Sequence, residues 1–305
     1  MKNCRLIWGV IFVLSFTSVL GQQDAQYTQY MYNMNMLNPA YAGSRGNLSV
    51  GLLGRTQWVG IEGAPQTITF SLNSPVGKNV GLGLSAIADI HGPVKEQNLY
   101  ADFSYTLRVS DLGRLAFGVK AGASFLDVNL LSLNPNDPEF SNTLSNNVSE
   151  VYPNIGAGAY YYSDRFYLGL SVPNFLERKH LKDDTGIVST ASEEMHYFLT
   201  SGYVFELSDD LKLKPSVLVK AAYGTPLSVD VSANMLMYEE FELGVSYRFD
   251  DSLSAMVGFQ LTPGIRAGYA YDYTLLNLGN YNSGSHEIIL LFDILKNNLK
   301  SPRFF

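Results

Sequence analysis

Apolar and polar residues alternate along most of the chain, and this period of two limits the possible folds more than any other feature. In residues 240–249, apolar side chains occupy the odd positions and polar or small residues occupy the even positions. Residues 228–237 repeat the pattern, with Val229, Val231 and Ala233 on one face. Successive side chains of a β-strand point to opposite faces, so the alternation predicts strands with two chemically different faces. An amphipathic helix would place apolar residues three and four positions apart, and these segments do not.

Fourteen segments carry this signal. They lie near residues 46–56, 66–73, 80–89, 97–108, 113–126, 152–162, 165–172, 195–207, 211–221, 227–237, 240–249, 252–261, 264–274 and 285–294. A tilted strand crosses a bilayer in about 9–11 residues, which is close to the length of many of these segments. Bacterial outer-membrane barrels have an even number of strands, so that both termini lie on one side. The pattern therefore predicts an all-β, transmembrane, antiparallel barrel of about fourteen strands.

The lengths of the predicted connections alternate as well. The even-numbered connections are short, for example residues 163–164 and 262–263. The three longest, near residues 127–151, 173–194 and 275–284, are all odd-numbered. Outer-membrane barrels have short periplasmic turns and long external loops, so this parity favours a barrel that begins in the periplasm. The eleventh connection is short and is the exception.

The two faces of the predicted strands suit a wet lumen and a lipid exterior. One face carries charged residues, namely Asp102, Arg108, Lys120, Lys214, Asp230, Glu242, Arg248, Arg266 and Asp272. The same face carries Gly118, Gly122, Gly169, Gly244, Gly258 and Gly268, which leave room for a plug or for side chains from across the barrel. The other face is rich in Leu, Val, Phe and Tyr. We expect the Tyr-rich residues 160–162 and 269–273 to form aromatic girdles at the membrane interfaces.

The first 21 residues have the pattern of an export signal. Lys2 and Arg5 precede an apolar run over residues 6–20, and Gly21 is a small residue at a plausible cleavage position. The alternative is an uncleaved anchor. Beyond residue 21 no run of 18 apolar residues occurs, so no transmembrane helix is expected. A soluble β-sandwich also alternates, but the signal, the strand lengths, the loop parity and the aromatic last residue favour the membrane barrel.

Residues 22–45 do not fit the strand pattern. They are rich in Gln, Asn, Met and Tyr, and Asp24 is the single charged residue before Arg45. We expect this segment to pack into the periplasmic mouth or the lumen as a plug, and a loose leader is the alternative. The predicted division is a signal peptide at 1–21, an N-terminal segment at 22–45 and a barrel at 46–305.

The sequence contains few signs of a catalytic, cofactor or nucleic-acid site. The chain has 21 Lys and Arg against 28 Asp and Glu, a net charge of −7, which argues against a nucleic-acid partner. The one cysteine, Cys4, lies in the signal, which excludes a disulfide framework. Residues 81–86 match a loose G-x-G-x-x-A but lie inside a predicted strand, so they do not indicate a dinucleotide site. We expect no metal, no cofactor and no enzyme activity.

The histidines have no metal-ligand spacing. We expect two in external loops and two near strand starts, in the order His91, His180, His196 and His286.

Several motifs follow one another in a characteristic order. They occupy residues 38–46, 57–61, 63–67, 81–84, 160–167, 169–174, 267–273 and 278–288. Each is weak alone, but their shared order and spacing resemble the PorP/SprF family of Bacteroidota outer-membrane proteins. The resemblance runs from about residue 23 to Phe305.

The resemblance implies an outer-membrane protein that functions in type IX secretion and gliding motility. It implies that the barrel helps an exported protein, such as a large adhesin, to reach or stay on the cell surface. The implied partners are outer-membrane lipid, that secreted protein and type IX secretion components. The family motifs suggest structural or partner-contact residues rather than catalytic ones: Asn38, Pro39, Tyr41, Gly43, Arg45, Trp58, Gly279, Asn280 and Tyr281.

Two hypotheses of different class follow. The first is an interaction protein that docks secretion machinery and a secreted client. The second is a passive pore for small solutes. A lipid-modifying enzyme is a third and weaker hypothesis, because no Ser, His and acid residues stand out as a group.

Overall fold

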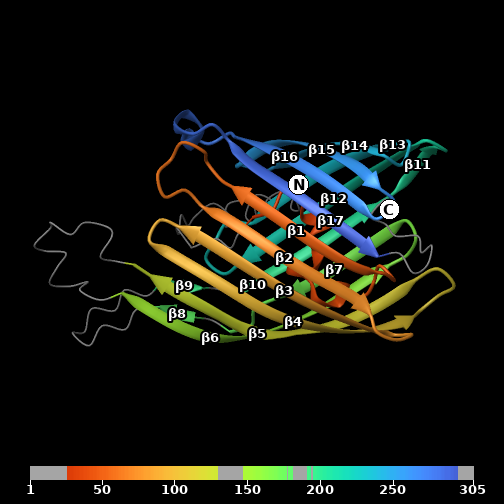
Figure 1. Ribbon diagram of the computed structural model, residues 1–305, viewed down its shortest axis with the longest axis horizontal. Helices are drawn as coiled ribbons and strands as arrows, with labels where there is room; N and C mark the ends of the chain where they lie inside the picture. The colour runs from red at the N-terminus through yellow and green to blue at the C-terminus, as the bar shows by residue number, and fades with distance from the viewer. Residues whose placement is uncertain (1–25, 130–146, 177, 181–190, 194, 295–305) are drawn as a thin grey trace, which may run out of the picture.

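The computed structural model describes residues 26–129, 147–176, 178–180, 191–193 and 195–294. Most of these residues form long antiparallel strands (Figure 1). The long strands are β1 (Leu48–Thr56), β2 (Gln66–Pro75), β3 (Val80–His91), β4 (Val94–Arg108), β5 (Arg114–Val128), β6 (Val148–Tyr162), β7 (Phe166–Val172), β10 (His196–Tyr203), β12 (Leu211–Ala222), β13 (Ser228–Met237), β14 (Phe241–Arg248), β15 (Ser252–Thr262), β16 (Ile265–Thr274) and β17 (Ser285–Ile294).

These strands form a closed barrel. Each pairs with its neighbours in the chain, β1 pairs with β17, and β10 pairs with β12 across the remaining gap. A short strand, β11 (Phe205–Ser208), continues β10 beyond Val204 and pairs with the same neighbour, β12. The ring therefore has fourteen positions, and the predicted outer-membrane barrel is confirmed. A separate hairpin of β8 (Arg178–His180) and β9 (Ala191–Glu193) lies between β7 and β10 in the chain.

The alternation of the sequence becomes an inside and an outside. In β14, Glu242 and Arg248 are buried, whereas Leu243 and Val245 are exposed by 47% and 59%. Polar side chains thus face the interior and apolar side chains face outward. A soluble sandwich would bury the apolar face, so this arrangement fits a barrel that meets lipid.

The charged residues predicted to face the lumen do so, with one difference. Eight of the nine are buried: Asp102, Lys120, Lys214, Asp230, Glu242, Arg248, Arg266 and Asp272. The ninth, Arg108, has a side chain that is 71% exposed, and it pairs with Asp111 in the following turn. Arg108 is the last residue of β4, so its side chain lies at the rim, beyond the packed interior.

The aromatic girdle prediction is wrong for two tyrosines. Tyr160 and Tyr162 are 3% and 8% exposed and point into the barrel, where their rings stack with centroids 5.4 Å apart. Of the three tyrosines, only Tyr161 occupies an outward-facing position in β6. Tyr269 and Tyr273 of β16 lie on the outer face as expected, exposed by 37% and 56%.

The connections distinguish the two ends of the barrel. The end with the even-numbered connections is called the short-turn end here, and the opposite end is the long-loop end. The third connection, residues 92–93, is a tight turn with Gly92 at a φ of +55°, so one further odd connection is short. His91 was predicted to lie in an external loop. It is instead the last residue of β3. The middle of the fifth connection, and of the seventh, lies outside the described residues.

The barrel rim is uneven at the long-loop end. β4, β5 and β6 each have 15 residues, but β7 has 7 and pairs only with residues 157–162 of β6. Residues 148–156 of β6 therefore extend beyond its pairing with β7. Phe175 N donates to Ile155 O at this edge, and Pro153, two residues away on the same side, has no N–H to offer. A proline at an open edge discourages pairing with other strands.

Leu84 tests which face meets lipid, because it lies near the middle of β3 with its side chain 54% exposed. Leu84→Arg is expected to lower the free energy of unfolding from lipid vesicles by about 2–4 kcal/mol, since the charge would lie deep in the bilayer. The control is Leu112→Arg, because Leu112 lies in a short turn and is 72% exposed. Denaturant unfolding measures both variants, and equal losses would contradict the assignment.

Candidate functional site

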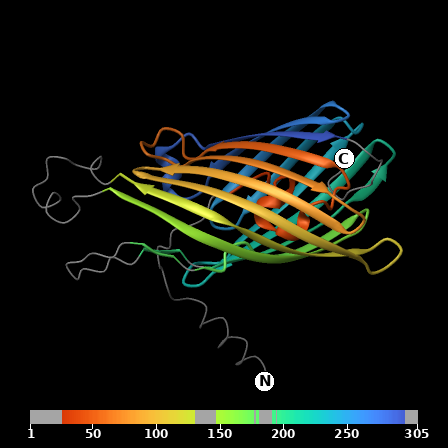
Figure 2. The ribbon, with the colours of Figure 1, turned by 60° about the horizontal axis from the view of Figure 1, so that its bottom comes forward.

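Residues 26–47, called the inner segment here, lie inside the barrel (Figure 2). The segment contains three short helical turns: η1 (Tyr30–Tyr32), α2 (Met34–Leu37) and η2 (Pro39–Tyr41). Every residue from 27 to 42 is buried. The Gln, Asn, Tyr and Met side chains of the inner segment carry no charge. Their burial therefore costs little free energy once the polar ones are hydrogen-bonded. None of the helices among the described residues is long and apolar enough to cross a membrane.

The inner segment runs along the barrel from the long-loop end to the short-turn end. Thr28 contacts Arg55 and Asp272, which lie close to the long-loop ends of their strands. Ala42 O accepts a hydrogen bond from Ser104, and Gly43 N donates to Asn73 near the short-turn end. The segment therefore lies beside most of the strands and bridges the two ends of the lumen.

A buried ionic cluster holds the start of the inner segment. Arg55 forms ion pairs with Asp272 at 2.7 Å and with Glu287 at 3.1 Å, and all three side chains are at most 3% exposed. The backbone N–H groups of Thr28 and Gln29 donate to the Glu287 carboxylate at 2.9 and 2.8 Å. One cation and two backbone donors thus share one carboxylate. Such charge-assisted bonds are stronger than neutral ones, so the cluster fixes where the segment begins.

A second cluster surrounds Tyr32. Its hydroxyl donates to the Glu242 carboxylate, which also pairs with Arg266 and accepts from Asn234 at 2.6 Å. Lys214 Nζ lies 4.7 Å from the centre of the Tyr32 ring, and Arg266 Cζ lies 5.2 Å from it. Both cations therefore make cation–π contacts with this ring. The uncharged aromatic side chain thus lets the segment contact two wall cations at once.

Polar contacts continue along the middle of the segment. Asp102 and Lys120 form a fully buried ion pair at 2.9 Å between β4 and β5. Asn35 donates to the same Asp102 carboxylate at 3.1 Å, and Lys120 donates to Asn35 O at 3.4 Å. A buried ion pair needs extra hydrogen bonds to offset its desolvation, and the inner segment supplies them.

Glycines on the lumen face form the seat of the inner segment. A Cβ on Gly118 would lie 2.3 Å from Ala40 N and 2.5 Å from Ala40 Cα. A Cβ on Gly81 would lie 2.1 Å from Ala42 O, and one on Gly158 would lie 2.2 Å from Asn38 Oδ1. The segment can approach the wall this closely only because these positions lack side chains. Of the predicted lumen glycines, Gly118, Gly169 and Gly268 meet the segment, whereas Gly122, Gly244 and Gly258 meet residues of the wall.

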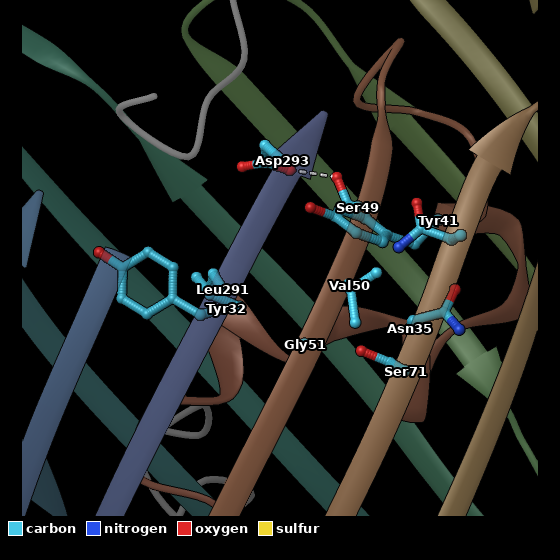
Figure 3. A pocket seen from close by; sticks show the side chains of 10 residues that line it. Tyr32, Asn35, Tyr41, Ser49, Val50, Gly51, Ser71, Leu291 and Asp293 are labelled. Carbon is cyan, nitrogen blue, oxygen red and sulfur yellow. Dashed lines mark hydrogen bonds between the residues drawn. The ribbon is translucent and has the colours of Figure 1, made fainter. Parts of the chain in front are cut away.

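Little space remains between the inner segment and strands β1, β2 and β17. Figure 3 shows Tyr32, Asn35 and Tyr41 of the inner segment among the residues that line this pocket. The cavity between them has a volume of about 10 Å³, which is room for about one water molecule. Ser49 and Asp293 hydrogen-bond at its edge. The inner segment therefore packs closely against this part of the wall.

The predicted motif residues of the N-terminal segment lie at the short-turn half of the lumen. Asn38 caps η2 by accepting from Ala40 N and also donates to Ala159 O at 3.0 Å, and Pro39 is the first residue of that helix. Tyr41 packs edge-on against Tyr160. Gly43 has a φ of +73°, and Arg45 pairs with Asp293 at 2.6 Å.

The other predicted motif residues meet at the long-loop end. Val59 N donates to Gly284 O, and Ser283 N donates to Val59 O, which joins the connection after β1 to the one before β17. Trp58 lies in the first of these, with a φ of +45°. Gly279, Asn280 and Tyr281 belong to the short helix η4 (Asn277–Tyr281), and Tyr281 is 76% exposed.

The nine residues therefore form two groups at opposite ends and not one site. The prediction omitted Arg55, Glu287 and Tyr32, which hold the inner segment. The alternation of the sequence could have identified Arg55 and Glu287, because both occupy lumen-facing positions in their strands.

The family comparison covers most of the chain. A family profile described as type IX secretion system membrane protein PorP/SprF matches residues 19–292. No curated protein matches the sequence.

The chain is similar to solved outer-membrane barrels at low sequence identity. The CymD monoaromatic hydrocarbon channel is 14% identical, with 90% of this chain and 94% of that chain covered and a TM-score of 0.50. The Acinetobacter baumannii outer membrane protein Omp33 is 9% identical, with 82% and 100% covered and a TM-score of 0.47. The P. putida toluene transporter TodX is 10% identical, with 87% and 95% covered and a TM-score of 0.48.

Arg55 provides a test of the buried cluster. Arg55→Met would leave Asp272 and Glu287 buried without their cation, and it is expected to cost about 3–5 kcal/mol of unfolding free energy. Arg165→Met is the matched control, because the Arg165–Glu206 pair is 53% and 44% exposed, and its loss should cost about 0–1 kcal/mol. Denaturant unfolding in vesicles measures both. An effect of Arg55→Met no larger than the control would show that the cluster does not stabilise the barrel.

Proposed function

The chain belongs to the type IX secretion system membrane protein family PorP/SprF, and on this premise we propose that it is a docking barrel of that system. In this proposal the protein, which lies in the outer membrane, binds secretion components at its short-turn end. It binds a secreted surface protein, such as a gliding adhesin, at its long-loop end. Its role is to bind and hold partners and not to catalyse a reaction.

The inner segment inside the barrel is the observation that supports this proposal. A solute pore needs a continuous wet path, but the inner segment occupies the lumen through buried ion clusters and glycine contacts. A barrel of about fourteen strands is wide enough to be either open or filled, and here the interior is occupied. A barrel whose interior holds such a segment is suited to present fixed surfaces at its two ends.

The long-loop end offers a joined surface for the secreted partner. The backbone bonds between Val59 and residues 283–284 fix two connections that are far apart in the sequence. Tyr281 and Leu276 on this surface are 76% and 51% exposed. Tyrosine is enriched among the residues that contribute most binding energy in protein interfaces, so Tyr281 is the candidate anchor of this surface.

A passive pore is the alternative function. The CymD monoaromatic hydrocarbon channel shares the barrel fold. A pore role here would require the inner segment to move or to leave a path beside it.

Deletion of residues 24–44 separates the two functions. If the inner segment blocks the lumen, the deletion is expected to raise single-channel conductance in planar bilayers several-fold, because it would uncover a charged, wet interior. Arg45 is retained in this variant, so its ion pair with Asp293 can still form. Unchanged conductance would contradict the plug.

A point variant serves if the deletion does not fold. Gly118→Leu places a side chain where Ala40 lies and should unseat the inner segment, which would also raise conductance. Gly54→Leu is the control, because a Cβ on Gly54 has no atom within 4 Å. High conductance of the unmodified barrel would instead favour the pore.

Co-purification tests the docking itself. The protein carries an affinity tag in the connection between β5 and β6 and is extracted from its native outer membrane in mild detergent. Mass spectrometry is expected to find type IX secretion components or a large surface protein enriched with it. An outer-membrane barrel of another family with the same tag is the control. Recovery of the barrel alone in several detergents would count against docking.

A further inference from the structure

A pocket of about 370 Å³ opens at the short-turn end, and we call it the mouth pocket. Its floor is the end of the inner segment, and its walls are the turn between β2 and β3 and the ends of β4, β5 and β6. It is lined by Ala42, Gly43, Ser44, Gly46, Pro75, Gly77, Lys78, Asn79, Val80, Gly81, Thr106, Arg108, Arg114 and Tyr162. The volume falls in the range of small-ligand and peptide side-chain pockets.

The charged side chains that line the mouth pocket are all cations. They are Lys78, Arg108 and Arg114, and the lining contains no Asp or Glu. Arg108 pairs with Asp111 at 3.2 Å, and both side chains are exposed. Within the described part of the chain, neither Lys78 nor Arg114 forms an ion pair with another residue. Arg114 contacts the Tyr162 hydroxyl, which is neutral, so the charges of Lys78 and Arg114 both remain for an anionic ligand.

The pocket faces the interior of the mouth and not the lipid. Thr106 and Arg108 share the parity of the buried Ser104 in β4, and Tyr162 is buried on the inner face of β6. Lipid headgroups approach the outer face of a barrel, so a ligand of this pocket has to arrive from the aqueous side. In outer-membrane barrels the short-turn end faces the periplasm.

The opposite part of the same rim is acidic. Exposed carboxylates gather on the turns around β11 to β14, at Glu206, Asp209, Asp210, Glu239 and Glu240. Arg165 and Lys212 offset only part of this charge, through their pairs with Glu206 and Glu239. The rim is thus divided by charge, which would orient a charged partner as it approaches.

We propose that the mouth pocket binds an acidic segment of a periplasmic protein. Arg114 offers a planar fork that matches a carboxylate, Lys78 offers a second positive charge, and Arg108 borders the site. The glycines of the lining keep backbone close to the ligand and leave room for its side chains. The inference rests on the proposed docking function and adds the chemistry of the partner at the short-turn end.

Binding of a fluorescein-labelled hexaglutamate peptide to the purified full-length protein in detergent tests the proposal. Fluorescence anisotropy is expected to show saturable binding that weakens as salt is raised. The double variant Lys78→Gln, Arg114→Gln should weaken it about tenfold or more, because two charge-assisted contacts are lost. Arg165→Gln with Lys212→Gln removes the same charge from the acidic part of the rim and should leave binding within about twofold, since these side chains lie outside the pocket.

A charge reversal provides a positive outcome. Lys78→Glu with Arg114→Glu should abolish hexaglutamate binding and create binding of labelled hexalysine. Equal weakening by both glutamine pairs would overturn the proposal, because it would show general attraction and not a site. Absence of saturable hexaglutamate binding would overturn it too. Neither result affects co-purification with secretion partners, so the docking function is judged separately.

Discussion

The closure of the sheet is the constraint on which the rest of the structure depends. In lipid, every backbone N–H and C=O must find a partner within the protein, so an open sheet edge is too costly. The pairing of β1 with β17 and of β10 with β12 removes the edges in the membrane-spanning part. Closure with fourteen strands then creates an interior that side chains from the wall alone do not fill. The inner segment is the consequence, because it occupies that interior.

Closure also turns the polar face of every strand inward, and the interior has to balance its own charge. Among the described residues, six cations and five carboxylates are buried there, namely Arg45, Arg55, Lys120, Lys214, Arg248, Arg266, Asp102, Asp230, Glu242, Asp272 and Glu287. A sixth carboxylate, Asp293, pairs with Arg45 and has a side chain that is 8% exposed. The net charge of −7 therefore comes from residues outside this set. A balanced interior lowers the cost of burying each charge, since every ion has a partner nearby. The acidic and basic parts of the short-turn rim belong to the remaining, exposed charge.

The sequence predicted the strands because the period of two is local, but it did not predict contacts that depend on closure. Arg55 and Glu287 are 232 residues apart and meet only through the register of β1 with β17. Tyr160 and Tyr162 resemble girdle residues by composition, yet their parity, shared with Gly158, points them inward. The break at Val204 could not be seen either, because the alternation continues through it. The local alternation determines which face of its strand each residue occupies. Closure of the barrel determines which residues of different strands come into contact.

The inner segment contributes one charge, Arg45, to this balance. Without Arg45 the wall still has five cations near six carboxylates, so its ion pairs do not depend on the rest of the segment. What the segment supplies is neutral: the backbone donors at Glu287, the amide at Asp102 and the Tyr32 ring beside Lys214 and Arg266. Water could replace each of these groups at modest cost. The contacts with the wall glycines are different, because their surface fits the backbone of Ala40 and Ala42 closely. Water molecules would not reproduce this close packing. The fit to the glycines therefore selects the segment over water, while the ion clusters set its register along the barrel.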